Sequence, residues 1–278
     1  MLRRILVVVY GLIAYVTSLA VVVYAIGFLA NVAVPRGIDD GSDGSVGLAV
    51  LVNGGLLAVF AVQHSTMARP GFKRWLAERL PPSIERSTYL LAASLALIAV
   101  MILWQPMPEP VWVAETGALR AGLWSLYLLG WVTVVGSTFM IDHFDLFGLS
   151  QVVARARDRD HVPPTFRLTL LYRVVRHPIM VGFLMAFWAT PDMSQGRLLF
   201  AALGTAYILI GVRLEERDLR EQLGEDYRRY EQQVPRFLPD VRTIVGRSAA
   251  TSEDRHGDAR TGHAGGPRGR RSRDRLRP

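Results

Sequence analysis

Four long apolar runs constrain what this chain can fold into more than any other feature of its sequence. Each run lacks Asp, Glu, Lys and Arg, and a helix of about 20 such residues crosses a hydrocarbon core of roughly 30 Å. The apolar residues stay together instead of recurring at every second or every third to fourth position. The sequence therefore predicts a polytopic membrane protein with an all-α fold, whose first four spans cover Ile5–Ala30, Val46–Ala68, Thr88–Gln105 and Ala121–Ile141.

The first run could instead belong to a cleaved signal peptide, because Arg3 and Arg4 precede it. A signal peptide has a shorter apolar segment, which ends in a small-residue cleavage site. This run continues for about 25 apolar residues without such a site. We therefore expect it to be retained as the first span.

The connections between the runs differ in charge. The first connection, Val32–Ser45, is acidic, whereas the second has five basic residues and two acidic ones: Arg69, Lys73, Arg74, Arg79 and Arg86 with Glu78 and Glu85. Excess Lys and Arg stay on the cytoplasmic side of a membrane. The amino terminus, the second connection and the segment after the fourth run are therefore predicted to be cytoplasmic.

The last third of the membrane region predicts a helical hairpin. Two shorter apolar pieces, Ile179–Thr190 and Leu198–Val212, are separated by a break that begins at Pro191. The break is either a turn on the far side of the membrane or the tip of a shallower hairpin. A charged cytoplasmic helix over Leu214–Tyr230 is predicted to follow and to end before Pro235.

The final segment differs in composition from the rest. Residues 242–278 contain ten Arg and four acidic residues, and so hold six of the eight net positive charges of the 278-residue chain. Such a segment buries too little apolar surface to fold. We predict a membrane domain over residues 1–241 and a disordered basic tail over residues 242–278, with the carboxyl terminus in the cytoplasm. The chain has no cysteine, which excludes disulfides and thiolate metal sites.

Ionisable side chains gather at one predicted end of the bundle. His64 lies near the inner end of the second span, His143 and Asp145 follow the fourth, and His177 and the pair Glu215-Glu216 flank the mouth of the hairpin. Polar groups at membrane depth are costly unless they are paired or functional. The pattern favours a polar pocket that opens to the cytoplasm.

Each of these residues also has a simpler interpretation. Arg176 and His177 could be interfacial anchors, with Pro178 at an ordinary first helical position. His64 could be satisfied by a backbone carbonyl, and Glu215 and Glu216 could lie on a solvated face. Asp145 could cap a helix. Their occurrence together at one end is what favours a site.

A set of motifs in the carboxyl-terminal half resembles the isoprenylcysteine carboxyl methyltransferase and phospholipid methyltransferase superfamily. The motifs are Tyr172-x3-Arg176-His177-Pro178-x3-Gly182, a short hairpin, Glu215-Glu216, and Gly224-Glu225-Asp226-Tyr227-x2-Tyr230. The resemblance implies that this half binds S-adenosyl-L-methionine. It implies the following cofactor-binding residues: Gln151, Tyr172, Arg176, His177, Pro178, Ile179, Met180 and Glu215. Met180 stands where the superfamily usually has Tyr.

The amino-terminal half resembles the bacterial methanethiol S-methyltransferase family, in residues 24–28, 34–39, 60–73, 85–89 and 137–149. This resemblance runs from about residue 5 to residue 240, and Ser150 departs from the Arg expected before Gln151. It implies methylation of methanethiol to dimethyl sulfide in a bacterial inner membrane. Proteins named for nitric-oxide metabolism share the fold and some of the motifs.

Methyl transfer to a thiol needs a base or a site that lowers the pKa of the thiol, because the thiolate is the nucleophile. His64 and His143 are the candidate catalytic residues. His64 is favoured because Asn53 and Phe60 lie on its helical face and are expected to shape a small pocket beside it. The expected partners are a small volatile thiol and the lipid bilayer, with no metal, no nucleic acid and no obligate protein partner.

Two other functions stay open on the sequence alone. One is a membrane methyltransferase that acts on a lipid or an isoprenoid thiol, which would need a long lateral groove. The other is a non-catalytic membrane protein that binds or senses a ligand. Binding of S-adenosyl-L-methionine would separate the second from the two enzymes.

Overall fold

The computed structural model describes residues 1–41, 44–162 and 170–239, and about three quarters of these residues are helical. The helices and strands are α1 (Leu2–Ala30), α2 (Val46–Ala68), α3 (Pro70–Ala77), α4 (Pro82–Leu103), β1 (Pro110–Val113), α5 (Gly117–Ile141), α6 (His143–Leu146), α7 (Leu149–Ala156), the 3-10 turn η1 (Leu170–Arg173), α8 (Pro178–Trp188), β2 (Asp192–Ser194), α9 (Gln195–Leu223) and α10 (Glu225–Gln233).

Within the described residues, five helices, α1, α2, α4, α5 and α9, are long and apolar enough to cross a membrane. The predicted all-α membrane bundle is therefore confirmed. The first four of these helices coincide with the four apolar runs, although α4 begins at Pro82 and not at Thr88. Its first turn contains Glu85, which interrupts the apolar run but suits the positive end of a helix dipole.

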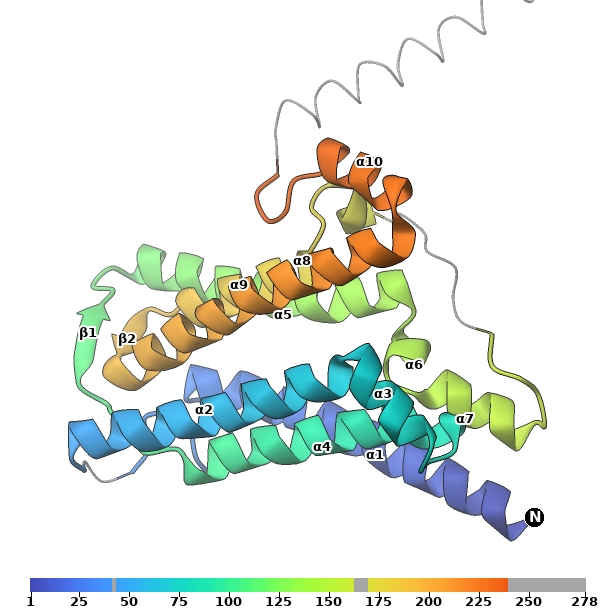
Figure 1. Cartoon of the computed structure of the whole chain (residues 1–278). Coiled ribbons are helices and arrows are strands. Elements are labelled where there is room, and N and C mark those ends of the chain that lie inside the picture. The colour runs from blue at the N-terminus through green and yellow to red at the C-terminus, as the bar shows by residue number, and fades with distance from the viewer. Residues whose placement is uncertain (42–43, 163–169, 240–278) are drawn as a thin grey trace, which may run out of the picture. The chain divides into compact units, whose positions relative to one another are not determined.

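The bundle has two layers (Figure 1). Helices α1, α2 and α4 pack together in one layer, and α5, α8 and α9 form the other. The short antiparallel ribbon of β1 and β2 lies at one end. Helices α3, α6, α7 and α10 lie at the opposite end, where α2, α5 and α9 finish.

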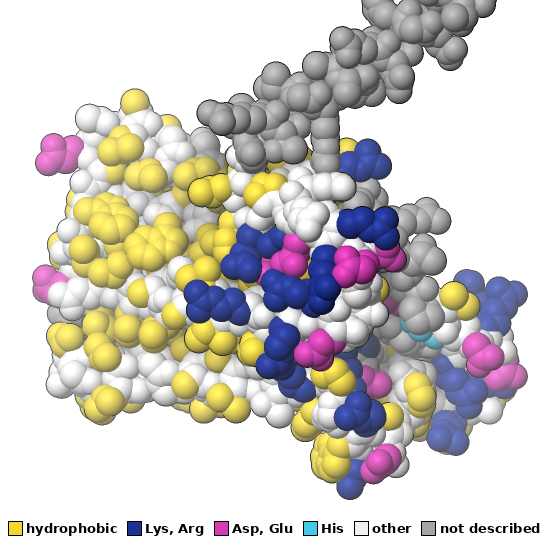
Figure 2. All heavy atoms as spheres, turned by 45° about the horizontal axis from the view of Figure 1, so that its top comes forward, with side chains coloured by type: hydrophobic (Ala, Val, Ile, Leu, Met, Phe, Trp, Pro, Cys, Tyr) yellow, Lys and Arg dark blue, Asp and Glu magenta, His cyan; other side chains and the backbone are white. Residues whose placement is uncertain are grey.

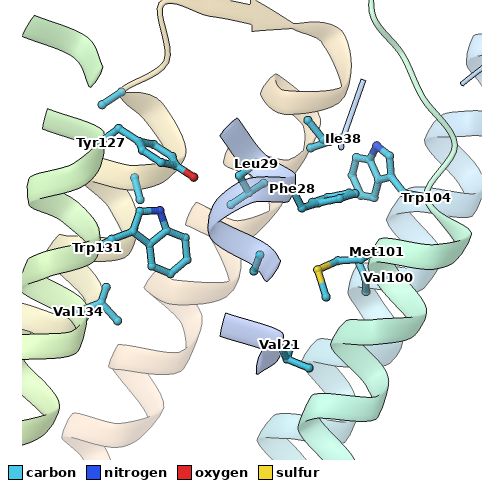
Figure 3. Close-up of a cluster of buried hydrophobic side chains, with 13 residues drawn as sticks. Val21, Phe28, Leu29, Ile38, Val100, Met101, Trp104, Tyr127, Trp131 and Val134 are labelled. Carbon is cyan, nitrogen blue, oxygen red and sulfur yellow. The ribbon is translucent and has the colours of Figure 1, made fainter. Parts of the chain in front are cut away.

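Aromatic side chains fill the core between the layers (Figure 3). Phe28 of α1 meets the ring of Trp104 edge to face, with centroids 6.4 Å apart, and Tyr127 and Trp131 approach α1 from α5. The Tyr127 hydroxyl donates to the carbonyl of Ile26 at 2.5 Å. Buried tyrosine thereby keeps a hydrogen-bond partner within the apolar core.

Glycine allows α5 and α8 to cross closely. A Cβ atom on Gly130 would lie 2.7 Å from the carbonyl oxygen of Gly182, and one on Gly182 would lie 2.6 Å from that of Gly130. Any side chain at either position would force the helices apart. This contact fixes the start of α8, which carries the predicted cofactor residues.

The predicted hairpin forms, with unequal arms. Helix α8 has 11 residues, about 16 Å at 1.5 Å per residue, and is shorter than an upright span, whereas α9 has 29. The break between them pairs with β1 at the far end of the bundle, which agrees with a far-side turn.

The charged helix predicted over Leu214–Tyr230 is wrong in its bounds. Helix α9 continues from Gln195 through the charged cluster to Leu223, because charge alone does not end a helix. Gly224, with φ of +56°, separates it from α10. Glycine adopts such a backbone conformation without steric cost.

Buried polar side chains hold the end of the bundle that carries the strands. The Asn53 amide has no exposed surface and forms two hydrogen bonds with the backbone of Gln105, both 2.8 Å long. Buried Arg197 pairs with Asp39 at 2.9 Å and donates to the Thr190 hydroxyl at 2.7 Å. Asn53 therefore closes this end, and the expectation that it shapes a pocket beside His64 is wrong.

Residues Met1–Phe237 form one compact unit. The predicted tail, residues 242–278, lies outside the described residues. The domain boundary after residue 241 stays a prediction.

Candidate active site

The mouth of the hairpin brings together the two polar clusters of the sequence. Glu216, which has no exposed surface, accepts from Nε2 of His177 at 3.1 Å and pairs with Arg176 at 2.9 Å. Arg176 and His177 precede α8, whereas Glu216 lies near the end of α9. A buried carboxylate needs such partners, because an unpaired charge in a low-dielectric interior is costly.

The segment after α10 completes this cluster. The backbone N–H of Arg176 donates to the carbonyl of Pro235 at 2.9 Å, and the guanidinium of Arg236 contacts both carboxylate oxygens of Glu216. These hydrogen bonds raise the pKa of Arg236 above its ordinary value. Glu231 of α10 accepts two hydrogen bonds from Arg220, at 2.7 and 2.9 Å, which lower the pKa of its carboxyl.

The neighbouring acids Glu215 and Glu216 have different environments. The side chain of Glu215 is 53% exposed, and its carboxylate lies 3.8 Å from Nδ1 of His177. Burial, followed by the negative charge of Glu215, raises the pKa of the Tyr172 hydroxyl. The structure thus places Glu215, His177 and Tyr172 together, and their predicted role in cofactor binding stays a prediction. Glu216 links the polar segment before α8 to the charged part of α9. No role in cofactor binding was predicted for it from the sequence.

The remaining predicted cofactor residues lie in two places. Pro178, Ile179 and Met180 form the first turn of α8, directly after His177. Gln151 lies on α7, where its amide donates to the carboxylate of Asp145 at 3.1 Å. Asp145 also bonds His161 at 2.5 Å.

His64 lies in an aromatic cluster formed by three helices. Its ring stacks on Phe60 of the same helix at 5.3 Å, and the ring of Tyr207 in α9 meets it edge to face at 6.4 Å. The hydroxyl of Tyr89 in α4 lies 2.8 Å from Nε2 of His64. Phe60, His64, Tyr89 and Tyr207 are all only partly buried. We call these four residues the aromatic cluster.

His143 is more enclosed than His64. Both of its ring nitrogens are engaged, Nε2 with the Tyr15 hydroxyl at 3.0 Å and Nδ1 with the Thr138 hydroxyl at 2.8 Å. The ring stacks on Phe139 at 4.1 Å, and only 6% of the residue is exposed. Burial lowers the pKa of His143. These contacts suit a packing role, and its catalytic role stays a prediction.

Charged side chains gather at this end of the molecule. Figure 2 shows Lys and Arg side chains with interspersed acids beside a largely hydrophobic flank. The basic residues include Arg74 and Arg79 near α3, Arg217 and Arg220 in α9, and Arg228 in α10. The flank matches the lipid-facing surface expected of a membrane bundle.

The residues around the hairpin mouth fit a sulfonium cofactor in kind. The carboxylate of Glu215 and the ring of Tyr172 can stabilise a cation. Buried polar atoms without a hydrogen-bond partner among the described residues include Nε of Arg176, Oε1 of Gln151 and the Tyr227 hydroxyl. Such orphaned groups are uncommon in protein interiors and indicate room for further polar contacts.

Comparison with known proteins assigns the chain to a family. A family model described as NnrU protein matches residues 51–234. A protein from Mycobacterium tuberculosis named methanethiol S-methyltransferase is 51% identical over 238 residues, which cover 86% of this chain and 98% of that protein. The chain belongs to the methanethiol S-methyltransferase family. A second relative, methanethiol S-methyltransferase 2 of Bradyrhizobium diazoefficiens, is 47% identical over 86% of this chain and 92% of its own length.

The methanethiol S-methyltransferase family has more distant relatives in animals. Nurim of Bos taurus is 31% identical over 174 residues, 60% of this chain and 66% of that protein. No solved structure matches the chain. The family resemblance that the sequence motifs predicted is confirmed, and the NnrU match spans both the aromatic cluster and the hairpin mouth.

The sequence reasoning missed four residues of this end: Tyr89, Tyr207, Glu216 as the buried acid, and Arg236. Tyr207 and Glu215 are eight residues apart and so share a face of α9, which was a signal in the sequence. Tyr89 and Arg236 reach the site from segments far away in the chain. Their contacts depend on how the helices pack.

Proposed function

We propose that this chain is an S-adenosyl-L-methionine-dependent methyltransferase that converts methanethiol to dimethyl sulfide. The observation that carries the proposal is the 51% identity to a protein named methanethiol S-methyltransferase over nearly the whole length of that protein. The acidic and aromatic side chains at the hairpin mouth support a sulfonium cofactor. The proposed location is a bacterial inner membrane, with both termini in the cytoplasm.

The reaction moves one methyl group and one proton. S-adenosyl-L-methionine supplies the methyl on its sulfonium; the thiol sulfur forms the new carbon–sulfur bond, and the electron pair of the broken bond stays on the donor sulfur. The products are dimethyl sulfide, S-adenosyl-L-homocysteine and a proton. The protein must position both sulfurs in line and accept the proton.

The proposed cofactor residues surround the start of α8. Glu215 and Tyr172 would face the positive sulfonium, and His177 would be held in place by its hydrogen bond to Glu216. Both terminal nitrogens of Arg176 already contact Glu216 and the carbonyl of Glu231, which leaves its Nε for a further partner. Arg176 therefore contributes mainly by its charge in this proposal.

His64 is the proposed base. The Tyr89 hydroxyl lies 2.8 Å from Nε2 and 3.2 Å from Nδ1 of His64. If the Nε2–H donates to this hydroxyl, Nδ1 keeps the lone pair that takes the thiol proton. A neutral imidazole with this geometry is the usual general base near neutral pH. His143 has both nitrogens bonded within the protein and is the weaker candidate.

The experiment uses membranes that contain the full chain, with methyl-labelled S-adenosyl-L-methionine and a panel of acceptors: small thiols, lipids and prenylcysteine analogues. We expect volatile label with methanethiol and little extractable label. Label in lipid or prenylcysteine would instead support the alternative methyltransferase. Cofactor binding without transfer to any acceptor would support a binding or sensing protein.

A further inference from the structure

The aromatic cluster is built from segments far apart in the chain. Phe60 and His64 lie one turn apart on α2, and Tyr89 and Tyr207 come from α4 and α9. The centroids of Phe60 and Tyr207 lie 6.1 Å apart, and those of His64 and Tyr89 lie 5.1 Å apart. Three rings therefore surround one imidazole.

Open space adjoins this cluster on α9. Gly211 follows Tyr207 by one turn and precedes Glu215 by one turn, so the three residues share a helical face. A Cβ atom built on Gly211 would meet no atom within 4 Å among the described residues. The partial exposure of the four cluster residues agrees with this opening. Along α9, the opening at Gly211 follows Tyr207 of the aromatic cluster and precedes Glu215.

The two sides of this space suit the two reactants of a methyl transfer. The Glu215 carboxylate lies 3.8 Å from Nδ1 of His177, so the face of α9 that carries Tyr207 and Gly211 continues to the proposed cofactor residues. Contacts between sulfur and aromatic rings contribute about 0.3–1.5 kcal/mol each. A small apolar thiol can pack its polarizable sulfur and its short alkyl group against these three rings.

We propose that the aromatic cluster and Gly211 form the binding site for the methyl acceptor, an alkanethiol, and that the rings of Phe60 and Tyr207 limit its chain length. This inference rests on the proposed function. In the site, the thiol sulfur lies beside His64, which takes its proton. The Tyr89 hydroxyl is a positioning group that orients His64.

The test compares how fast methanethiol and 1-propanethiol are methylated by wild-type protein and by variants of the cluster. Tyr207→Leu and Phe60→Leu should each raise the ratio of kcat/KM for propanethiol to that for methanethiol by about tenfold or more, the scale on which a pocket discriminates methylenes. Tyr207→Phe keeps the ring and should leave the ratio unchanged. Phe60→Leu gives an independent answer if Tyr207→Leu does not fold.

Matched variants control for general effects on the membrane domain. Phe200→Ala removes another aromatic ring of α9, one that packs against Trp104 and Phe187, and should leave the ratio unchanged. Gly211→Leu fills the open space and should lower kcat/KM for methanethiol by about tenfold or more. Gly122 is another helical glycine whose built Cβ would meet no described atom within 4 Å, and Gly122→Leu should leave kcat/KM for methanethiol unchanged.

Calorimetric titration with S-adenosyl-L-methionine provides a readout apart from activity. Every variant should keep wild-type cofactor affinity, because the changed residues line the acceptor side. An unchanged propanethiol ratio in both leucine variants, with normal cofactor affinity, would overturn the acceptor site while leaving the proposed function intact. Failure of the wild-type protein to methylate any thiol would overturn the proposed function itself, and the acceptor site with it.

Discussion

The two ends of the helical bundle both bury charged side chains, but they pair them differently. At the end with the strands, Arg197 pairs with the carboxylate of Asp39, its terminal nitrogens bond Thr190 and backbone carbonyls, and Asn53 bonds the backbone of Gln105. At the other end, Glu216 is surrounded by Arg176, Arg236 and His177, and Nε of Arg176 has no hydrogen-bond partner in the part of the chain that the structure describes.

From this difference we infer that one end is structural and that the other carries the chemistry. Groups that bond backbone carbonyls fix loops and leave little capacity for a ligand. A cluster of side-chain charges beside orphaned donors and an exposed carboxylate can bind one, and perturbed ionisable groups tend to gather at functional sites. The following variants test whether the two ends differ in this way.

Glu216→Ala should have the largest effect. It leaves the cations around it buried without their counter-charge, and breaking a buried ion pair costs about 3–5 kcal/mol. We expect a large fall in the unfolding temperature in detergent and a loss of binding of S-adenosyl-L-methionine. Glu216→Gln keeps the shape of the side chain and one carbonyl acceptor, so its unfolding temperature and its affinity for S-adenosyl-L-methionine should lie between those of the wild type and of Glu216→Ala. Wild-type stability in Glu216→Ala would show that the cluster does not hold this end together.

Arg197→Ala should destabilise the opposite end without touching the chemistry. The variant removes the ion pair with Asp39 and the hydrogen bonds to the Thr190 hydroxyl and the carbonyl of Asp192, and the loss of partners for buried polar groups costs about 1–3 kcal/mol. Thermal unfolding in detergent should report the loss. The affinity for S-adenosyl-L-methionine at a temperature where the variant is folded should not change. A marked loss of affinity would break the division between the ends.

Glu215→Ala should weaken cofactor binding with little effect on folding. Its side chain is half exposed, so stability depends little on it, whereas a lost contact to a cation costs affinity. We expect at least about a tenfold rise in Kd, equivalent to about 1.4 kcal/mol. Calorimetric titration measures it, and His177→Ala should behave similarly. Arg217→Ala, an exposed control on the same helix, should bind as the wild type does.

Arg120→Gln should have the smallest effect on the unfolding temperature, and this effect should disappear at low pH. Two hydrogen bonds of 2.6 Å from Arg120 lower the pKa of the Asp192 carboxyl, so the pair stabilises the fold above the ordinary pKa of Asp. This contribution disappears as the pH falls through the lowered pKa. Because both side chains are more than one third exposed, the gain is small. Unfolding temperatures of variant and wild type should differ slightly at pH 7 and converge at low pH.

The sequence predicted the spans better than the site. Apolar runs fixed four helices because a span is a local property, but the charged residues after Val212 concealed the length of α9. Glu215 and Glu216 are neighbours, and about 100° of helical rotation separates them. Only the crossing of α8 and α9 decides which of them is buried. Tyr89 reaches His64 from another helix, so no local pattern could reveal that contact.

The most direct test of the chemical end is a pH series of dimethyl sulfide production, measured by headspace gas chromatography for His64→Ala and His143→Ala. His64→Ala should lower turnover by roughly 10²-fold or more at neutral pH with cofactor affinity intact. That loss should shrink as the pH rises and free thiolate becomes abundant. His143→Ala should lose stability and keep the shape of the wild-type pH profile. Near wild-type turnover of His64→Ala at neutral pH would contradict the account, because the aromatic cluster would then not contain the base.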